Sequence, residues 1–110
     1  MNDYQKYLDS AIIELKRGGL VLAVLNLLKE PKYGYSLMQT MAARGYVIDQ
    51  STLYPLLRRL EQQGFLNSNW SVEETRPRKY YQLSEDGSSF LADLKDQWKK
   101  NTAIIDGMID

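Results

Sequence analysis

Residues 51–64 read STLYPLLRRLEQQG, and the architecture expected for the whole chain builds outward from them. Leucines stand at positions 53, 56, 57 and 60, which is the spacing of one apolar face of a helix. Gly64 follows as the residue that closes the helix. The segment therefore predicts an amphipathic helix whose outer face carries two arginines, Arg58 and Arg59.

Two residues are suitable N-caps for this helix, Asp49 and Ser51, because both side chains accept a hydrogen bond from a free amide of the first turn. Ser51 suits Pro55 better, since it keeps the missing N–H of the proline near the first turn, where its loss is tolerated. We expect the helix to be capped by Ser51.

A shorter helix is expected just before it, over Ser36–Arg44. Leu37 and Met41 give this segment an inward face, and Gly45 is placed to end it. Tyr46–Gln50 is then a brief extended connector. Two short helices joined by a tight connector, the second with arginines outside, have the outline of a helix-turn-helix.

The hydrophobic period changes to two after Gly64, which indicates strands near residues 66–72 and 78–83. Residues 73–77 form a polar turn between them, so the segment predicts a β-hairpin. Trp70 and Tyr81 are expected in the core, and Tyr35 is expected to pack as well.

A long helix is expected after the hairpin, from Glu85 to about Met108, with Ser84 as its N-cap. Its apolar seam follows a heptad spacing of three and four residues, which is typical of a helix that pairs with another. The seam consists of Leu91, Leu94, Trp98, Asn101, Ile105 and Met108.

The N-terminal part predicts one amphipathic helix over residues 4–15 and a second, apolar nearly all round, over Leu20–Leu28. Gly18 and Gly19 leave open whether these are two helices or one bent helix. The full order predicts a mainly α fold with a two-stranded β wing (an α+β protein), a winged helix-turn-helix plus a long C-terminal dimerisation helix. We expect residues 1–84 to form the N-terminal helix and DNA-binding domain and residues 85–110 the dimerisation helix.

Composition narrows the class of function. The 110 residues include no Cys and no His, which removes disulfides, thiolate metal sites and the usual general base. We therefore expect no enzyme, no metal and no cofactor. The first residues carry an early acid and no apolar core, and the longest apolar run is too short to span a bilayer. The protein is expected to be soluble and cytoplasmic, without a membrane partner.

The formal net charge is zero, but the charges are unevenly placed. Residues 31–84 hold seven basic and four acidic residues, a local net charge of +3, whereas residues 85–110 hold three basic and six acidic residues, a net charge of −3. A polyanion is attracted by the local field rather than by the sum. The middle of the chain is therefore where nucleic acid is expected to bind.

Several motifs also resemble the PadR family of bacterial transcriptional regulators. They are Pro31–Tyr35, Thr52–Glu61, Gly64, Arg78–Ser84 and Gly87, in the family's order and spacing, and the likeness runs from about Lys16 to the C-terminus. The single trailing helix with one Trp resembles the short subgroup, which includes multidrug-sensing repressors of the LmrR type. The resemblance implies a homodimer that represses from a dyad-symmetric operator on double-stranded DNA, with release by a small molecule in some members.

Candidate DNA contacts lie on the outer face of the second helix of the motif, on the hairpin and just before the first helix. Hydroxyls near a helix start take phosphate or base-edge bonds, and Arg clamps guanine or phosphate. A solvated helix face or turn is the plain alternative for each, and for Arg59 it is equally favoured. The candidates are Lys32, Tyr33, Ser51, Thr52, Tyr54, Pro55, Arg58, Arg59, Arg76, Arg78 and Lys79.

The C-terminal seam needs a partner, and a two-fold homodimer is the default. The apolar face of residues 4–15 is expected to extend the interface. The predicted interface residues are Leu8, Ile12, Leu91, Leu94, Trp98, Asn101, Ile105 and Met108.

Trp98 lies in the middle of the seam, so paired indoles are expected to form a slot for a flat aromatic or cationic effector. Asp93 and Asp96 would favour a cation, and Leu94 and Leu15 complete the expected ligand site. A packed interface anchor without a ligand is the alternative.

The leading hypothesis is thus a dimeric, ligand-responsive repressor. A constitutive or partner-controlled DNA-binding protein is the nearest alternative, and a winged-helix module that binds protein and no DNA is the alternative from another class.

Overall fold

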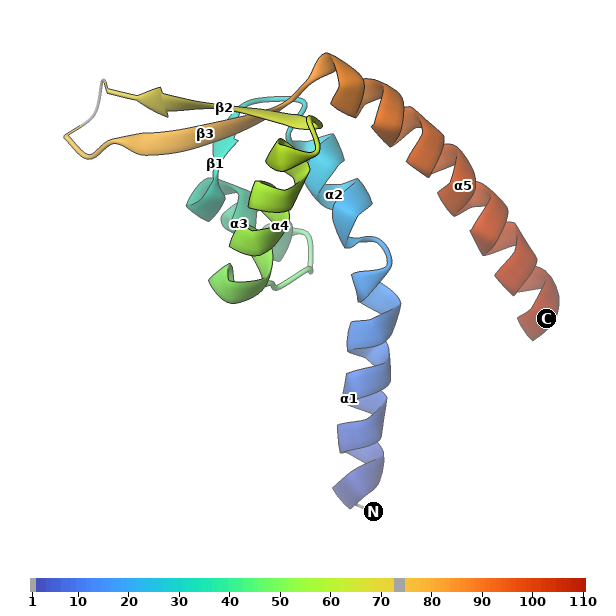
Figure 1. The fold of residues 1–110 in the computed structure, drawn as a ribbon. Helices are drawn as coiled ribbons and strands as arrows, with labels where there is room; N and C mark the ends of the chain where they lie inside the picture. The colour runs from blue at the N-terminus through green and yellow to red at the C-terminus, as the bar shows by residue number, and fades with distance from the viewer. Residues whose placement is uncertain (1, 73–74) are drawn as a thin grey trace.

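The architecture is that of a computed structural model which describes residues 2–72 and 75–110 (Figure 1). It confirms a mainly helical winged fold with a long C-terminal helix. The elements in chain order are α1 (Asn2–Arg17), α2 (Leu20–Leu27), β1 (Lys32–Tyr33), α3 (Gly34–Ala43), α4 (Gln50–Gln62), β2 (Leu66–Ser71), β3 (Arg78–Leu83) and α5 (Glu85–Ile109).

The core lies where α2, α3 and α4 meet the base of the sheet. All four leucines of the predicted α4 stripe are buried, as is Tyr81 of β3. Leu25 of α2 and Leu28, the C-cap of that helix, are also fully buried, which fits the all-round apolar character of the segment. The residues of this core are Leu20, Val24, Leu25, Leu28, Leu37, Met41, Leu53, Leu56, Leu57, Leu60, Leu66, Tyr81 and Leu91.

The sheet has three antiparallel strands in the order β1-β3-β2, so the wing is one strand larger than the sequence predicts. β2 and β3 form the expected hairpin, with Leu66 opposite Leu83 and Trp70 opposite Lys79. The additional strand, β1, pairs Tyr33 with Tyr80. A strand of two residues is too short to show a period of two, which is why β1 was not predicted.

Two helix ends follow from glycines in the left-handed region. Gly45 has φ +93° after α3 and Gly64 has φ +87° after α4, as the sequence predicts. The prediction that Ser51 caps α4 is wrong, because the N-cap is Asp49. The Asp49 carboxylate accepts the hydrogen bond of the Thr52 amide, so Pro55 lies two residues deeper in the helix than expected.

Two aromatic residues expected inside the protein lie outside. Trp70 is 64% exposed and Tyr35 is 52% exposed. Trp70 has the strand alternation of a core residue, but the hairpin continues past the end of the core, so most of the side chain stays exposed. Figure 1 shows the wing reaching beyond the helices.

The two terminal helices leave the body of the molecule (Figure 1). Gly18 and Gly19 separate α1 from α2, so this part of the chain forms two helices and not one bent helix. Residues 3–18 are all exposed, and so are residues 95–110. The first half of α5 packs against α2 and the core, as far as the Trp98 ring, which lies close to Gly19. In the ranges that the structure describes, no helix has the length and apolar character that a membrane crossing requires.

Candidate nucleic-acid interface

The exposed side of α4 begins at its cap. Oδ1 of Asp49 accepts hydrogen bonds from Ser51 Oγ and from the Thr52 amide, each at 2.8 Å. The bond from Ser51, followed by those from Thr52, lowers the pKa of Asp49 below its ordinary value. Ser51, Thr52 and Pro55 are exposed on this turn, so the helix presents small polar groups at its start.

Tyr54 is half-buried and joins α4 to the start of α3. Its ring lies over Gly34, where an added Cβ would come within 2.5 Å of both Tyr54 Cε1 and Oη. Gly34 is thus a residue that the packing of Tyr54 requires. One helical turn later Arg58 is exposed, as the sequence predicts for an outward position.

A hollow of about 390 Å³ lies between α4, the start of α3 and the wing. Arg58 and Tyr54 form the α4 side, while Trp70 and Arg78 come from the two strands of the hairpin. The hollow brings together five of the predicted contact residues and Trp70, which was expected in the core. Its lining is Tyr33, Gly34, Tyr54, Arg58, Trp70, Arg78, Lys79 and Tyr81.

Lys79, a predicted contact residue, forms an ion pair within the molecule. Its Nζ lies 3.2 Å from Glu61 Oε1 and 5.2 Å from the centre of the Tyr81 ring. The hydrogen bond to Glu61 raises the pKa of Lys79. Glu61 also accepts a hydrogen bond from Ser68, and this bond is the main reason why the pKa of Glu61 is lowered. Lys79 therefore links the wing to α4, and its charge is offset by a carboxylate.

Arg78 lies over the ring of Tyr33, with 4.4 Å between the guanidinium carbon and the ring centre. Tyr33 in turn meets Tyr80 edge to face, with 5.4 Å between ring centres. These contacts join β3 to β1. Arg76 is exposed further along the hairpin. Glu73 and Glu74, two acidic residues of the predicted polar turn, lie outside the described residues.

Lys32 is half-buried in β1, opposite Tyr81, so it is less available than a residue on a free loop.

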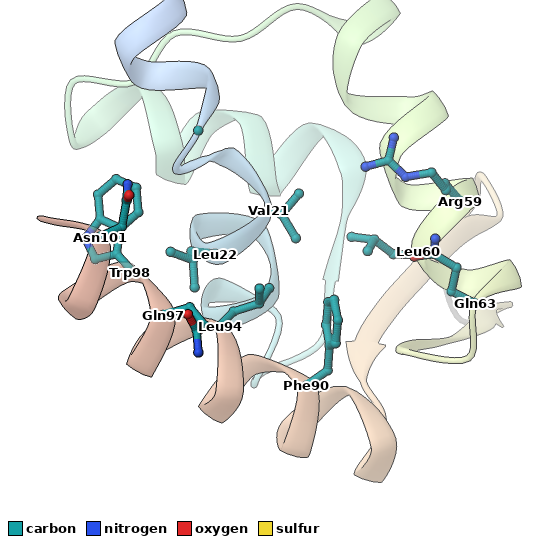
Figure 2. Close-up of a pocket in the computed structure, with 11 residues that line it drawn as sticks. Val21, Leu22, Arg59, Leu60, Gln63, Phe90, Leu94, Gln97, Trp98 and Asn101 are labelled. Atoms are coloured by element: carbon teal, nitrogen blue, oxygen red, sulfur yellow. The ribbon is translucent and has the colours of Figure 1, made fainter. Parts of the chain in front are cut away.

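Arg59 lies on a different side of α4 from Arg58. It lines a cavity of about 480 Å³ between α2, α4 and α5, which Figure 2 shows. Phe90 lies near Arg59 and Gln63, while Trp98 and Asn101 lie toward the far end (Figure 2). The lining is Gly18, Val21, Leu22, Arg59, Leu60, Gln63, Phe90, Leu94, Gln97, Trp98 and Asn101.

The predicted ligand residues divide at this cavity. Trp98 and Leu94 line it, whereas Asp93, Asp96 and Leu15 do not. Asp96 instead forms an ion pair with Lys100, with 3.0 Å between its Oδ2 and Nζ. The heptad pattern singled out Trp98 as a candidate ligand residue. Gln63 and Phe90 also line the cavity, but no sequence pattern marked either of them as a binding residue.

The predicted interface residues divide as well. Leu91 is only 2% exposed and belongs to the core of its own subunit, so its expected contact with a second subunit is corrected. The reason is that the first turns of α5 pack on the body before the helix leaves it. Leu94 is half-buried. The remaining predicted residues are all exposed, namely Leu8, Ile12, Trp98, Asn101, Ile105 and Met108.

The helix-turn-helix of α3 and α4, with a basic wing beside it, defines the winged helix-turn-helix class of proteins. The model of the family described as "Transcriptional regulator PadR-like family" matches residues 21–93. The chain belongs to this PadR-like family of transcriptional regulators. Its members bind DNA and are regulators, not enzymes.

Individual proteins show the same likeness. The crystal structure of a PadR family regulator from Eggerthella lenta matches the structure of this chain with a TM-score of 0.97 and 39% sequence identity. The match covers 100% of this chain and 98% of that one. The structure of a PadR-like transcription factor from Bacteroides fragilis matches with a TM-score of 0.73 and 34% sequence identity. The match covers 90% of this chain and 98% of that one. A transcriptional regulator of Mycobacterium tuberculosis is 32% identical over 81 residues, which are 73% of this chain and 76% of that protein.

Proposed function

We propose that the protein is a homodimeric, cytoplasmic transcriptional repressor that binds a dyad-symmetric operator and is released by a small aromatic ligand. The observation that carries the DNA part is the shared exposed face of α4 and the wing. Ser51, Thr52, Pro55 and Arg58 are exposed on α4, and Arg76 is exposed on the hairpin. In such a fold the helix enters the major groove while the wing reaches the backbone or the neighbouring minor groove.

The DNA contacts proposed here are fewer than the sequence predicts. Tyr54 and Arg58 contact DNA from α4, with Ser51 and Thr52 at the helix start. Lys79 and Arg59 are left out, because Lys79 pairs with Glu61 and Arg59 lines the internal cavity. Tyr33 and Lys32 support the wing rather than read the duplex.

Dimerisation is supported by apolar surface at both ends of the chain. α1 exposes Leu8 and Ile12, and the second half of α5 exposes Ile105 and Met108. Apolar side chains exposed together on helices that leave the body mark an interaction site. In the proposal residues 1–84 hold the DNA-binding part, and α5 from Lys95 onward joins two copies.

The cavity beside Trp98 supports an aromatic effector. Phe90 and Trp98 offer ring faces, and three amides offer hydrogen bonds. Among the described residues that line it, Arg59 alone is charged. An aromatic anion therefore suits the cavity better than the cation that Asp93 and Asp96 suggested. Binding there would change how α5 sits on α2 and α4, and with it the spacing of the two wings.

Selection of genomic fragments by the purified protein, followed by fluorescence anisotropy in a salt series, tests the DNA part. We expect a preferred operator and an affinity that falls steeply with salt, because phosphate contacts release counterions. Fragments bound without sequence preference and without a salt slope would favour a protein-binding module instead. Naphthoate and a naphthyl ammonium of the same size then test the effector, and release by neither would favour a constitutive regulator.

A further inference from the structure

Trp70 is a large aromatic side chain in a place that packing does not explain. It lies on the same face of β2 as Leu66 and Ser68, by the alternation of a strand. Leu66 on that face is buried in the core, yet Trp70 remains 64% exposed. An indole that lies on the core-facing side of the strand, but beyond the end of the core, buries little apolar surface. It therefore adds little to the stability of the fold.

The surroundings of Trp70 are basic and aromatic. It forms part of the wall of the 390 Å³ hollow, across from Tyr54 and Arg58. Arg78 and Lys79 also line that hollow, and Trp70 stands opposite Lys79 on the hairpin. No acidic side chain is among the described residues that line it. Because Glu61 offsets the charge of Lys79, the guanidinium groups of Arg58 and Arg78 are the cations of the hollow that attract a negative group. Trp70 offers a flat apolar wall beside them.

The shape of the hollow points to its occupant. Arg58 is exposed on α4 and lines the hollow at the same time, so the hollow opens on the face proposed to meet DNA. A nucleotide backbone presents a phosphate next to an apolar sugar ring. Arginine and an indole N–H donate to phosphate oxygens, and the face of an indole packs on a sugar.

We propose that Trp70 is a DNA-positioning residue that holds one sugar–phosphate unit of duplex DNA in the hollow between α4 and the wing. This inference rests on the proposed function and deepens it. Trp70 and Arg58 contact the DNA backbone between the groove that α4 enters and the contact made by the wing. They thereby fix the position of the DNA backbone between α4 and the wing. Contacts of this kind set the register of a protein on DNA and carry no sequence information.

Substitution of Trp70 tests the proposal in the full-length protein. Trp70→Ala is expected to weaken binding about tenfold, which corresponds to the loss of one aromatic contact. The loss should be equal for the selected operator and for a scrambled duplex, and the salt slope should be unchanged because no charge is removed. Trp70→Phe keeps a ring and should recover most of the affinity.

Val72→Ala is the matched control, since Val72 is an exposed apolar residue just past the same strand. It is expected to bind like the wild type. Thermal unfolding of all three variants should match the wild type, because both side chains are exposed.

Indole fluorescence gives a second readout, because the chain has two tryptophans. Duplex DNA should change the emission of the wild type, and the change should be absent in Trp70→Phe. Inorganic phosphate at the same charge concentration should leave the emission unchanged, and a change with phosphate alone would make the hollow a simple anion site and overturn the inference.

The failures of the two proposals are distinguishable. Wild type that binds its operator while Trp70→Ala binds equally well overturns the role of Trp70 and leaves the proposed function standing. Wild type that binds no duplex overturns both.

Discussion

Gly87, in the first turn of α5, lies against the backbone of the loop that follows α4. An added Cβ there would collide with the carbonyl of Phe65. Ser84 fixes the same junction: its Oγ accepts from the Gly87 amide at 2.9 Å and donates to the Gly64 carbonyl at 2.6 Å. Since backbone on both sides closes the site, neither side can move cheaply.

Gly87→Ala is therefore expected to lower the free energy of unfolding by about 2–3 kcal/mol, the cost of overpacking a closed site. Gly107→Ala is the control, because nothing lies within 4 Å of a Cβ there. It should leave stability unchanged or raise it by up to about 1 kcal/mol through helix propensity. Urea unfolding followed by circular dichroism measures both, and equal stability of the two variants would contradict the contact.

The carboxylate of Glu61 joins three elements at the level of packing between helix and sheet. It extends from α4, accepts from Ser68 of β2 and pairs with Lys79 of β3. The bonds favour the ionised form, so the pKa of Glu61 is lower in the folded state than the ordinary value of 4.5. A lowered folded pKa gives stability that is present above 4.5 and lost as the pH falls through the folded value.

Glu61→Gln is accordingly expected to cost about 1 kcal/mol at neutral pH, since the pair is partly exposed. The difference from wild type should shrink as the pH falls below the ordinary pKa of glutamate and should vanish in acid. Glu14→Gln removes an exposed carboxylate from α1 and should change stability little at any of these pH values. Unfolding curves from pH 7 to pH 3 provide the measurement. A difference that persisted undiminished in acid would show that the carboxylate charge plays no part.

Elements with a strong local signal were predictable from the sequence, and places set by contacts between elements were not. The leucine stripe of α4 and the Ser84 cap of α5 are local patterns, and both were predicted correctly. Trp70 has the right alternation for a core residue, but the length of the core is decided by other segments. The ion pair of Lys79 was not predicted, because its partner, Glu61, is distant in the chain.

α4 also shows how two neighbouring residues of one helix can face different sites. Successive helical residues point about 100° apart, because a turn holds about 3.6 residues. Arg58 therefore lines the hollow beside the wing, while Arg59 lines the cavity beside Trp98. One helix thus connects the proposed DNA site to the proposed effector site through neighbouring arginines.

Arg59→Ala is expected to keep operator affinity within about twofold, since Arg59 is left out of the proposed DNA contacts. Release of the operator by naphthoate should need about tenfold more ligand, because a charge-assisted hydrogen bond to the carboxylate is lost. Arg44→Ala, another exposed arginine outside both sites, controls for the change in net charge. Anisotropy titrations of ligand into the preformed complex measure the effect. A tenfold loss of operator affinity in Arg59→Ala alone would instead return this residue to the DNA contacts.

The whole molecule is more extended than a compact chain of its length. The Cα radius of gyration is 16.3 Å, and the principal extents are 52 × 35 × 22 Å. A compact domain of this length has a radius of about 13 Å. The excess comes from α1 and the second half of α5, which leave the body and expose apolar side chains (Figure 1). A second copy that covers both helices would supply the burial that one chain lacks.

Ile105→Glu tests this at the centre of the exposed part of the α5 seam. Ile105 is 45% exposed in the single chain, so the substitution spares the subunit but places a charge in the proposed interface. Ala103→Glu introduces the same charge on the opposite face of α5 and is also exposed, which makes it the matched control. Sedimentation equilibrium at micromolar concentration should report a monomer for Ile105→Glu and a dimer for wild type and Ala103→Glu.

Operator binding should follow the assembly state. Two linked α4 helices bind two half-sites with a high effective concentration, so a monomer is expected to lose at least about tenfold in affinity. The loss should be confined to duplexes with both half-sites, since a single half-site engages one subunit in either case. If Ile105→Glu remained a dimer with full operator affinity, the two copies would have to meet through another surface, and the exposed face of α1 would be the next to substitute.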